Sequence, residues 1–287
     1  MELLTIDGFL GATDSVTRVF LDRVYPGLAN AVAEPVYLAA ILYWALFGYR
    51  IFAGYAALEW REMLAKIVMT VAVFGVLNWG GLASQIYGLF VSFMDSGAAT
   101  ILAGEPATNL LNALFKNADH ISRTLRSSSI FQINAIIEGT VLLIINSLLF
   151  TVALFYMTLA KIGLAITMLL LPLFIGFALF EGSRQWCINW LSKMLDFALI
   201  YILVVTIVKL GFVAFEQFIA DINQTASLIN TRPDLKPESH IVTNVFIVEA
   251  VLVLFMLQVR EWAGYLSSGA ASYGETIAMK FASHVRG

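Results

Sequence analysis

Three ionisable side chains, Arg50, Lys209 and Glu249, interrupt long apolar stretches of this 287-residue sequence. A charged group inside a membrane is costly, and such groups often form an ion relay or line a polar conduit. Arg50 and Lys209 lie near the ends of their stretches, where a long side chain can reach the aqueous interface. Glu249 lies in the middle of its stretch. We expect it to face other helices or a subunit interface, unless its helix is not fully embedded in the membrane.

The sequence lacks the motifs that common catalytic and nucleotide-binding sites require. It has no G-x-x-x-x-G-K-[ST], G-x-G-x-x-G or H-E-x-x-H motif and no G-x-S-x-G nucleophile elbow. The histidines His120, His240 and His284 are too dispersed for a local metal motif. The single cysteine, Cys187, excludes an intrachain disulfide and a thiolate metal cluster. We therefore expect no enzyme activity, no bound metal and no cofactor.

The composition indicates a membrane protein with several spans. Apolar residues make up 60% of the chain and charged residues 13%, against about a quarter charged in soluble domains. The mean hydropathy is +0.83, and the net charge of −3 leaves no broad basic face for nucleic acid. These values exclude a disordered chain, a coiled-coil rod and an ordinary cytosolic enzyme.

About 20 mostly apolar residues are needed to cross the hydrocarbon core as a helix. The stretches that qualify, five or six in number, are residues 36–58, 67–94, 139–160, 162–180, 197–215 and, more weakly, 241–259. The second is too long for one straight span, and Asn78-Trp79-Gly80-Gly81 is predicted to break it. Backbone groups in lipid must bond internally, so the fold class is all-α and polytopic. The six tryptophans fall mostly near span ends, which favours interfacial anchoring.

The first 35 residues are predicted to form an amphipathic segment rather than a secretory signal. Asp14 is a candidate N-cap, and Pro26-Gly27 is expected to end the helix. Between them lies one apolar stripe, made of Val16, Val19, Phe20 and Val24. The helix either binds a membrane surface or a partner, or packs on the protein's own spans.

The central polar segment, residues 95–138, is predicted to be a helical insertion outside the membrane. One face carries Leu110, Leu114, Ile121 and Leu125; the other carries Lys116, Arg123 and Arg126. The first face is too apolar to remain in water and the second too polar to enter lipid, so the helix must cover a neighbouring surface, in its own subunit or in another.

The expected regions are 1–35 (amphipathic segment), 36–94 (first membrane region), 95–138 (central segment), 139–215 (membrane core with a Pro-kinked hairpin) and 216–287 (loop, optional last span and tail).

Pro172 is expected to kink or interrupt its helix, because it removes one backbone hydrogen bond. Neighbouring helices can satisfy the carbonyl group that is freed. The short segment that follows carries Trp186 and Trp190 between Arg184 and Lys193, which predicts a bent hairpin fixed at the membrane surface. This hairpin has either a purely structural role or a role in a conduit.

One region of the sequence combines a proline-containing apolar stretch with an aromatic segment and a further span. It reads Leu169-Leu-Leu-Pro-Leu-Phe-Ile-Gly-Phe-Ala-Leu-Phe180, then Arg184, Trp186, Trp190 and Leu191, then an apolar span from Phe197. This pattern resembles the TrbL-type inner-membrane subunits of bacterial type IV secretion systems. The resemblance is sharpest over residues 155–210 and makes Pro172, Phe174, Phe180, Trp186 and Trp190 the hairpin motif. It implies a channel or platform subunit that moves DNA or protein and supports pilus or stalk assembly.

The resemblance further implies a place in the bacterial inner membrane, with a periplasmic central segment that contacts the pilus base and passing substrate. A homo-oligomeric ring is expected because a single subunit with few intramembrane polar groups cannot wall an aqueous path for a macromolecule. The implied partners are pilin, scaffold, stalk and secretion-ATPase subunits, together with membrane lipids. The distribution of basic residues does not by itself decide the orientation. A secondary transporter with a site at a broken helix is the alternative, although repeat symmetry is absent. A membrane-embedded enzyme ranks last.

Overall fold

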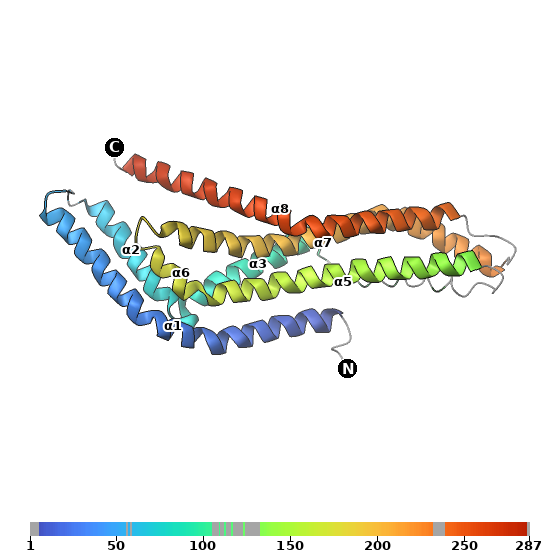
Figure 1. The fold of residues 1–287 in the computed structure, drawn as a ribbon, viewed down its shortest axis with the longest axis horizontal. Helices are drawn as coiled ribbons and strands as arrows, with labels where there is room; N and C mark the ends of the chain where they lie inside the picture. Colours follow the sequence, from blue (N-terminus) through green and yellow to red (C-terminus); the bar gives the residue numbers. More distant parts are fainter. Residues whose placement is uncertain are drawn as a thin grey trace. The chain divides into compact units, whose positions relative to one another are not determined.

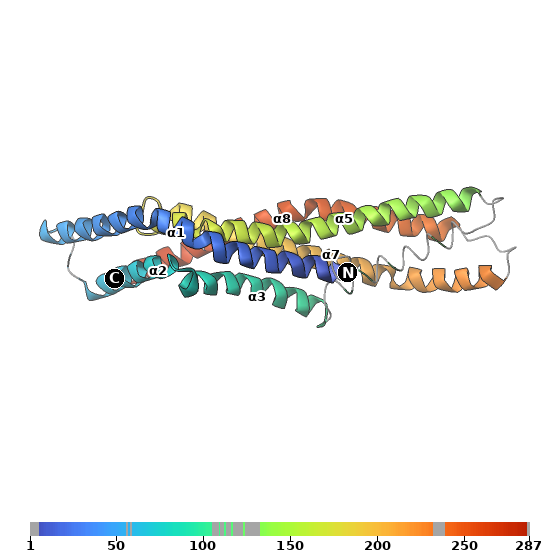
Figure 2. The same cartoon turned by 90° about the horizontal axis from the view of Figure 1, so that it is seen from below.

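A computed structural model of the chain describes residues 6–55, 57, 59–104, 133–231 and 239–285, together with positions 109, 112, 116 and 123. Every regular element within these residues is a helix, which confirms the all-α prediction. The elements are α1 (Ile6–Phe52), α2 (Trp60–Val76), the π-helix η2 (Trp79–Ala83), α3 (Ser84–Ile101), α5 (Ile133–Leu169), α6 (Leu171–Phe177), α7 (Arg184–Thr231) and α8 (Ser239–Val285). Figures 1 and 2 show them as ribbons.

The helices contribute to two compact units, which are described separately. Unit 1 comprises Met1–Leu10, Met94–Leu159 and Ile200–Trp262. Unit 2 comprises Gly11–Phe93, Ala160–Leu199 and Ala263–Gly287. The breaks in α2–α3 and at Pro172 both lie in unit 2.

Three helices are long and apolar enough to cross a membrane: Gly8–Phe52, Gly139–Leu169 and Arg184–Val213. A fourth crossing results if Trp60–Val76 and Trp79–Ile101 are counted as one span bent by 93°. This bend lies where Asn78-Trp79-Gly80-Gly81 was predicted to break the stretch, so that prediction is confirmed. The described residues thus support three or four spans.

One predicted boundary between spans is wrong. The stretches 139–160 and 162–180 were separated at Lys161, but α5 continues through this lysine to Leu169. Lysine is a good helix former, and a partner on α1 pairs with its charge. The break comes instead at Leu170, between the end of α5 and the start of α6.

The predicted start and end of the N-terminal helix are also wrong. Asp14 is not an N-cap but lies inside α1, which begins at Ile6 and runs through Pro26 and Pro35 to Phe52. A proline inside an apolar helix bends it without ending it when neighbouring groups satisfy the backbone. Figure 1 shows the corresponding change of direction within α1.

The apolar stripe predicted on this helix faces outward. Val16 and Val19 are 66% and 47% exposed, whereas Leu21 and Tyr25, on the opposite face, are fully buried. The helix therefore packs on its own unit through a second face. An exposed row of valines is compatible with lipid contact because lipid does not penalise apolar surface.

Candidate functional site

The Pro172 hairpin begins where α5 ends. Leu169 is the last residue of α5, and α6 starts at Leu171 with Pro172 in its first turn. A proline is tolerated there because the first amide groups of a helix have no partner within the helix. Leu171 and Pro172 are both buried. The prediction that Pro172 interrupts its helix is confirmed.

Trp190 closes the end of α5. Its indole Nε1 donates a 2.7 Å hydrogen bond to the carbonyl oxygen of Thr167, and the ring is 6% exposed. The last carbonyl groups of a helix have no partner within the helix. The Thr167 carbonyl therefore accepts from two donors, the Trp190 indole on α7 and the Leu170 amide, whose nitrogen lies 3.2 Å from the same oxygen. Interfacial anchoring, the interpretation given to the tryptophans from the sequence, is therefore wrong for Trp190.

Aromatic rings surround the turn between α6 and α7. Phe177 packs edge-on against Trp186 at 5.0 Å between ring centroids and against Phe174 at 6.4 Å. Trp186 remains 57% exposed, as expected for an interfacial residue. Phe180 packs against Tyr43 of α1 at 6.0 Å. These contacts fix the turn to the rest of unit 2.

The hairpin also packs through one small residue at a close helix crossing. A Cβ atom added to Gly163 of α5 would lie 2.3 Å from the Phe197 ring of α7. Such a distance is shorter than any van der Waals contact, so the close approach of α5 and α7 requires glycine. Together with Trp190, this contact determines how the two long helices meet.

The second break, between α2 and α3, is stabilised locally by Asn78. Its side-chain Oδ1 accepts a 3.1 Å hydrogen bond from the Gly80 amide. Gly81 has a non-helical backbone, and a Cβ atom there would lie 2.8 Å from the carbonyl oxygen of Gly75. Only glycine fits so close to another backbone. This explains why the sharp bend falls at the predicted residues.

Two side chains of α1 hold the same break in place. The Tyr25 hydroxyl donates a 2.7 Å hydrogen bond to the carbonyl oxygen of Val76, at the end of α2. The Trp79 indole donates a 2.5 Å hydrogen bond to Asp22 Oδ1. Sequence reasoning missed Tyr25 and Asp22, because their partners lie more than 50 residues away and no local pattern marks them.

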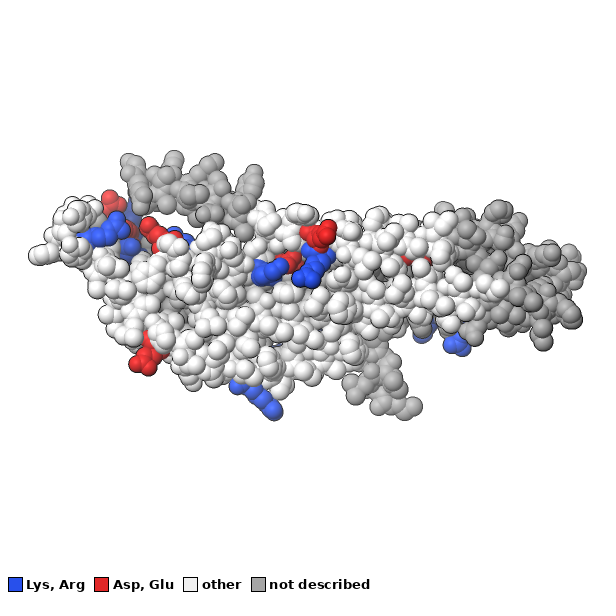
Figure 3. All heavy atoms as spheres, in the orientation of Figure 1, with Lys and Arg blue, Asp and Glu red and all other residues white. Residues whose placement is uncertain are grey.

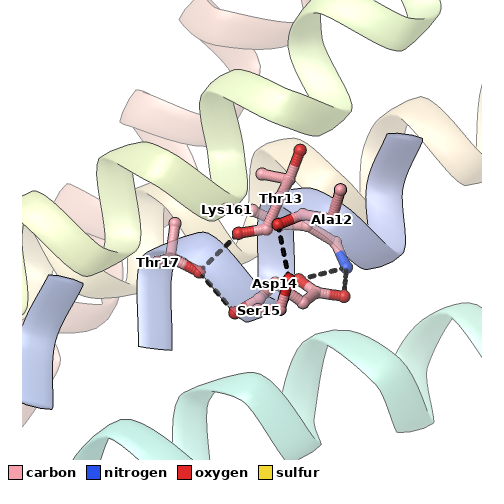
Figure 4. Close-up of polar contacts among 6 residues, drawn as sticks. All are labelled: Ala12, Thr13, Asp14, Ser15, Thr17 and Lys161. Atoms are coloured by element: carbon pink, nitrogen blue, oxygen red, sulfur yellow. Dashed lines mark hydrogen bonds and ion pairs between the residues drawn. The ribbon is translucent and has the colours of Figure 1, made fainter. Parts of the chain in front are cut away.

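An ion pair joins α1 and α5 in unit 2, and Figure 4 shows its surroundings. Lys161 Nζ lies 2.7 and 2.5 Å from the two carboxylate oxygens of Asp14. The lysine side chain is 11% exposed and the aspartate side chain 54%. The neighbouring hydroxyl of Thr17 donates to the Thr13 and Asp14 carbonyl oxygens. Asp14 therefore neutralises the one charge in an otherwise apolar part of α5.

The three ionisable residues singled out from the sequence fall in two different units. Arg50 is exposed in the last turn of α1, in unit 2. In unit 1, Lys209 is half-buried with its Nζ 5.7 Å from the centroid of the Phe212 ring. Glu249 is 4% exposed, and its Oε2 has no hydrogen-bond partner. None of the ion pairs among the described residues includes any of the three.

The predicted contact residues of the central segment fall largely outside the described residues. Leu110, Leu114, Ile121 and Arg126 all lie there. Lys116 and Arg123 are described, and both are helical and exposed.

Charged side chains are few on the face shown in Figure 3. They form small separate groups, and wide areas between them carry neither acidic nor basic residues. Many large apolar side chains are exposed, among them Phe52 at 93%, Leu89 at 70% and Ile144 at 63%. Such a surface suits a lipid or protein environment rather than water.

Comparisons with known proteins agree with this structure. A family model described as "TrbL/VirB6 plasmid conjugal transfer protein" matches residues 40–259, a range that includes both helix breaks and the hairpin. Two curated relatives are the type IV secretion system proteins VirB6 of Bartonella quintana and Bartonella henselae. Each is 24% identical over 191 residues, which cover 64% of this chain and 59% of the relative. The matched region thus spans about three fifths of the length of these relatives. The resemblance inferred from the hairpin motif is confirmed, and the chain belongs to the TrbL/VirB6 family.

Proposed function

We propose that the protein is a channel or platform subunit of a type IV secretion system in the bacterial inner membrane. It would move DNA or protein substrates and support pilus or stalk assembly, with energy supplied by separate ATPases. The observation that carries the proposal is the family match over residues 40–259, which contains the Pro172 hairpin. The protein itself would act as a structural component and not as an enzyme.

The two breaks support a fixed structural role. At each break, backbone carbonyls that helix formation leaves free are bound by side chains of the same unit. Trp190 binds the Thr167 carbonyl, and Tyr25 binds the Val76 carbonyl. A bent segment closed in this way can act as a rigid part of a wall.

The same contacts argue against the alternative, a secondary transporter. Transporters place free carbonyls and helix ends at a broken helix to bind ions or substrate. Here the carbonyls of Thr167 and Val76 are occupied by an indole and a phenol, and the Asn78 side chain bonds to Gly80. These groups would first have to leave their partners before a solute could bind.

The proposed topology has five or six spans, an N-terminal amphipathic helix and a periplasmic central segment. It requires crossings beyond the three or four that the described helices support. The additional candidates are the stretch around α6 and the stretch 241–259 of α8. Reporter fusions after residues 104, 182 and 269 would place these three positions on either side of the membrane.

The proposed partners are a second copy of this chain, a pilus-base or stalk subunit, the inner-membrane scaffold, pilin and the secretion ATPases. In this arrangement the apolar face of residues 110–125 docks on the stalk. The basic face, with Lys116, Arg123 and Arg126, makes salt-sensitive phosphate contacts with DNA. Protein substrates would pass the same face.

A strain that lacks the gene and is complemented with variants tests these roles. Leu114→Asp should abolish assembly with the stalk, whereas Arg123→Glu combined with Arg126→Glu should weaken substrate contact and leave assembly intact. Photocrosslinkers at positions 114, 123 and 126 report the contacts directly. Normal substrate transfer by the gene-deletion strain would refute the proposed function. Crosslinks confined to the same subunit would refute only the docking role.

A further inference from the structure

Glu249 is the one acidic side chain on the buried face of α8 in unit 1 among the described residues. That face also carries Leu252, Val253, Met256 and Val259, all of which are 8% exposed or less. The spacing of three and four residues places them in one row. Leu252 packs on α7, since a Cβ atom added to Gly211 would lie 2.6 Å from the Leu252 side chain. The carboxyl group of Glu249 is therefore one turn from a close helix contact.

Among the described residues, no positive charge pairs with this carboxyl group. Its Oε2 is buried without a hydrogen-bond partner, and none of the ion pairs among the described residues includes it. The other ionisable side chains described in unit 1 are Asp95 on α3, Tyr156 on α5, Tyr201 and Lys209 on α7, Arg260 and Glu261 on α8, and the exposed Lys116 and Arg123. The one cation among them on α7, Lys209, lies with its Nζ 5.7 Å from the centroid of the Phe212 ring.

The only other long polar side chain buried in the described part of unit 1 is neutral. Asn146 of α5 is 3% exposed, and its Nδ2 has no hydrogen-bond partner. An amide cannot balance a full charge. An unpaired carboxylate in apolar surroundings is so costly that the group takes up a proton instead.

We propose that Glu249 is a proton-binding site inside unit 1, where it exists as a neutral carboxylic acid that apolar carbodiimides can modify. Protonation turns one carboxyl oxygen into a hydroxyl donor and removes the charge from the packed face of α8. In the unfolded chain the same carboxyl is ionised at neutral pH. Packing α8 into unit 1 therefore takes up one proton, and the stability of the unit falls as the pH rises.

Reaction with N,N′-dicyclohexylcarbodiimide tests this assignment on the full-length protein in native membranes. The carboxylic acid adds across one C=N bond of the reagent, and the O-acylisourea formed rearranges to a stable N-acylurea. No group leaves and no oxidation or reduction occurs. Because the reaction starts from the protonated acid, peptide mass mapping should find the adduct on Glu249 at about pH 6 and less of it at about pH 9.

Two variants provide the controls. Glu249→Gln should lose the adduct, whereas Glu261→Gln, at an exposed position of the same helix, should retain it. Glu249→Gln should also unfold at the wild-type temperature or above it, with the gap widening as the pH rises. Three results would each overturn the proposal. Glu249 is not labelled in the folded wild type, or its labelling does not fall as the pH rises, or Glu249→Gln destabilises the protein as much as Glu249→Ala does. None of these readouts depends on the proposed secretion role.

Discussion

Lys161 and Asp14 lie 147 residues apart in the sequence, yet Lys161 Nζ approaches both carboxylate oxygens of Asp14 within 2.7 Å. The pair is asymmetric, because the lysine side chain is 11% exposed and the aspartate side chain 54%. Removing the aspartate takes its carboxylate away from an ammonium group that water reaches only in part, whereas removing the lysine leaves a carboxylate that water can solvate.

The asymmetry predicts unequal effects of neutralising the two residues. Asp14→Asn should lower the free energy of unfolding by about 1–2 kcal/mol and Lys161→Met by less. The double variant should resemble Lys161→Met, because the lysine charge is gone in both. Thermal unfolding of the four proteins in one detergent gives the comparison. Equal losses for the two single variants would contradict the argument from their unequal exposure to water.

The hydrogen bond from Trp190 to Thr167 predicts a specific role for this indole. Trp190→Phe keeps an aromatic ring but removes the donor, and should lower the free energy of unfolding by about 1 kcal/mol, or roughly 2–4 °C in melting temperature. Trp186→Phe is the matched control, since Trp186 lies only four residues away and is exposed. A larger effect of Trp186→Phe in a thermal shift assay would be inconsistent with this role.

Pro172→Ala is expected to let α5 continue across the present break and straighten the hairpin. The restored amide allows an ordinary helical hydrogen bond. We expect normal membrane insertion and impaired substrate transfer, measured by membrane fractionation and by a transfer assay in the complemented strain. Normal transfer by a stably inserted variant would show that the proline has no functional role.

The close approach of α5 and α7 predicts that Gly163 tolerates no side chain. Gly163→Ala should destabilise the protein by about 1–3 kcal/mol, because the methyl group would overlap the Phe197 ring. Gly48→Ala, where nothing lies within 4 Å of the added atom, is the control and should stabilise α1 slightly. If Gly163→Ala instead melts at the wild-type temperature, the two helices do not meet at this residue.

The sequence by itself determined the helical membrane class, the family and the places of both breaks. The helical membrane class follows from the hydropathy of whole stretches of about 20 residues. A single polar residue changes such an average little, so the prediction of the class does not depend on any one position. The breaks at Asn78 and Pro172 were predictable because their causes are local. A Gly-Gly pair permits a non-helical backbone, and a proline removes a hydrogen bond wherever it stands.

Only the tertiary structure decided how the long helices continue and what their polar groups bind. Lys161 was expected to end a span, but Asp14 neutralises it and α5 continues. Trp190 was expected at an interface, but the end of α5 offers it a carbonyl group. In each case the deciding partner lies on another helix, at a distance in sequence that no local periodicity encodes. The partner also affects the free energy of unfolding, because a charge or a hydrogen-bond donor that is shielded from water destabilises the fold when it is unpaired and costs less when it is paired.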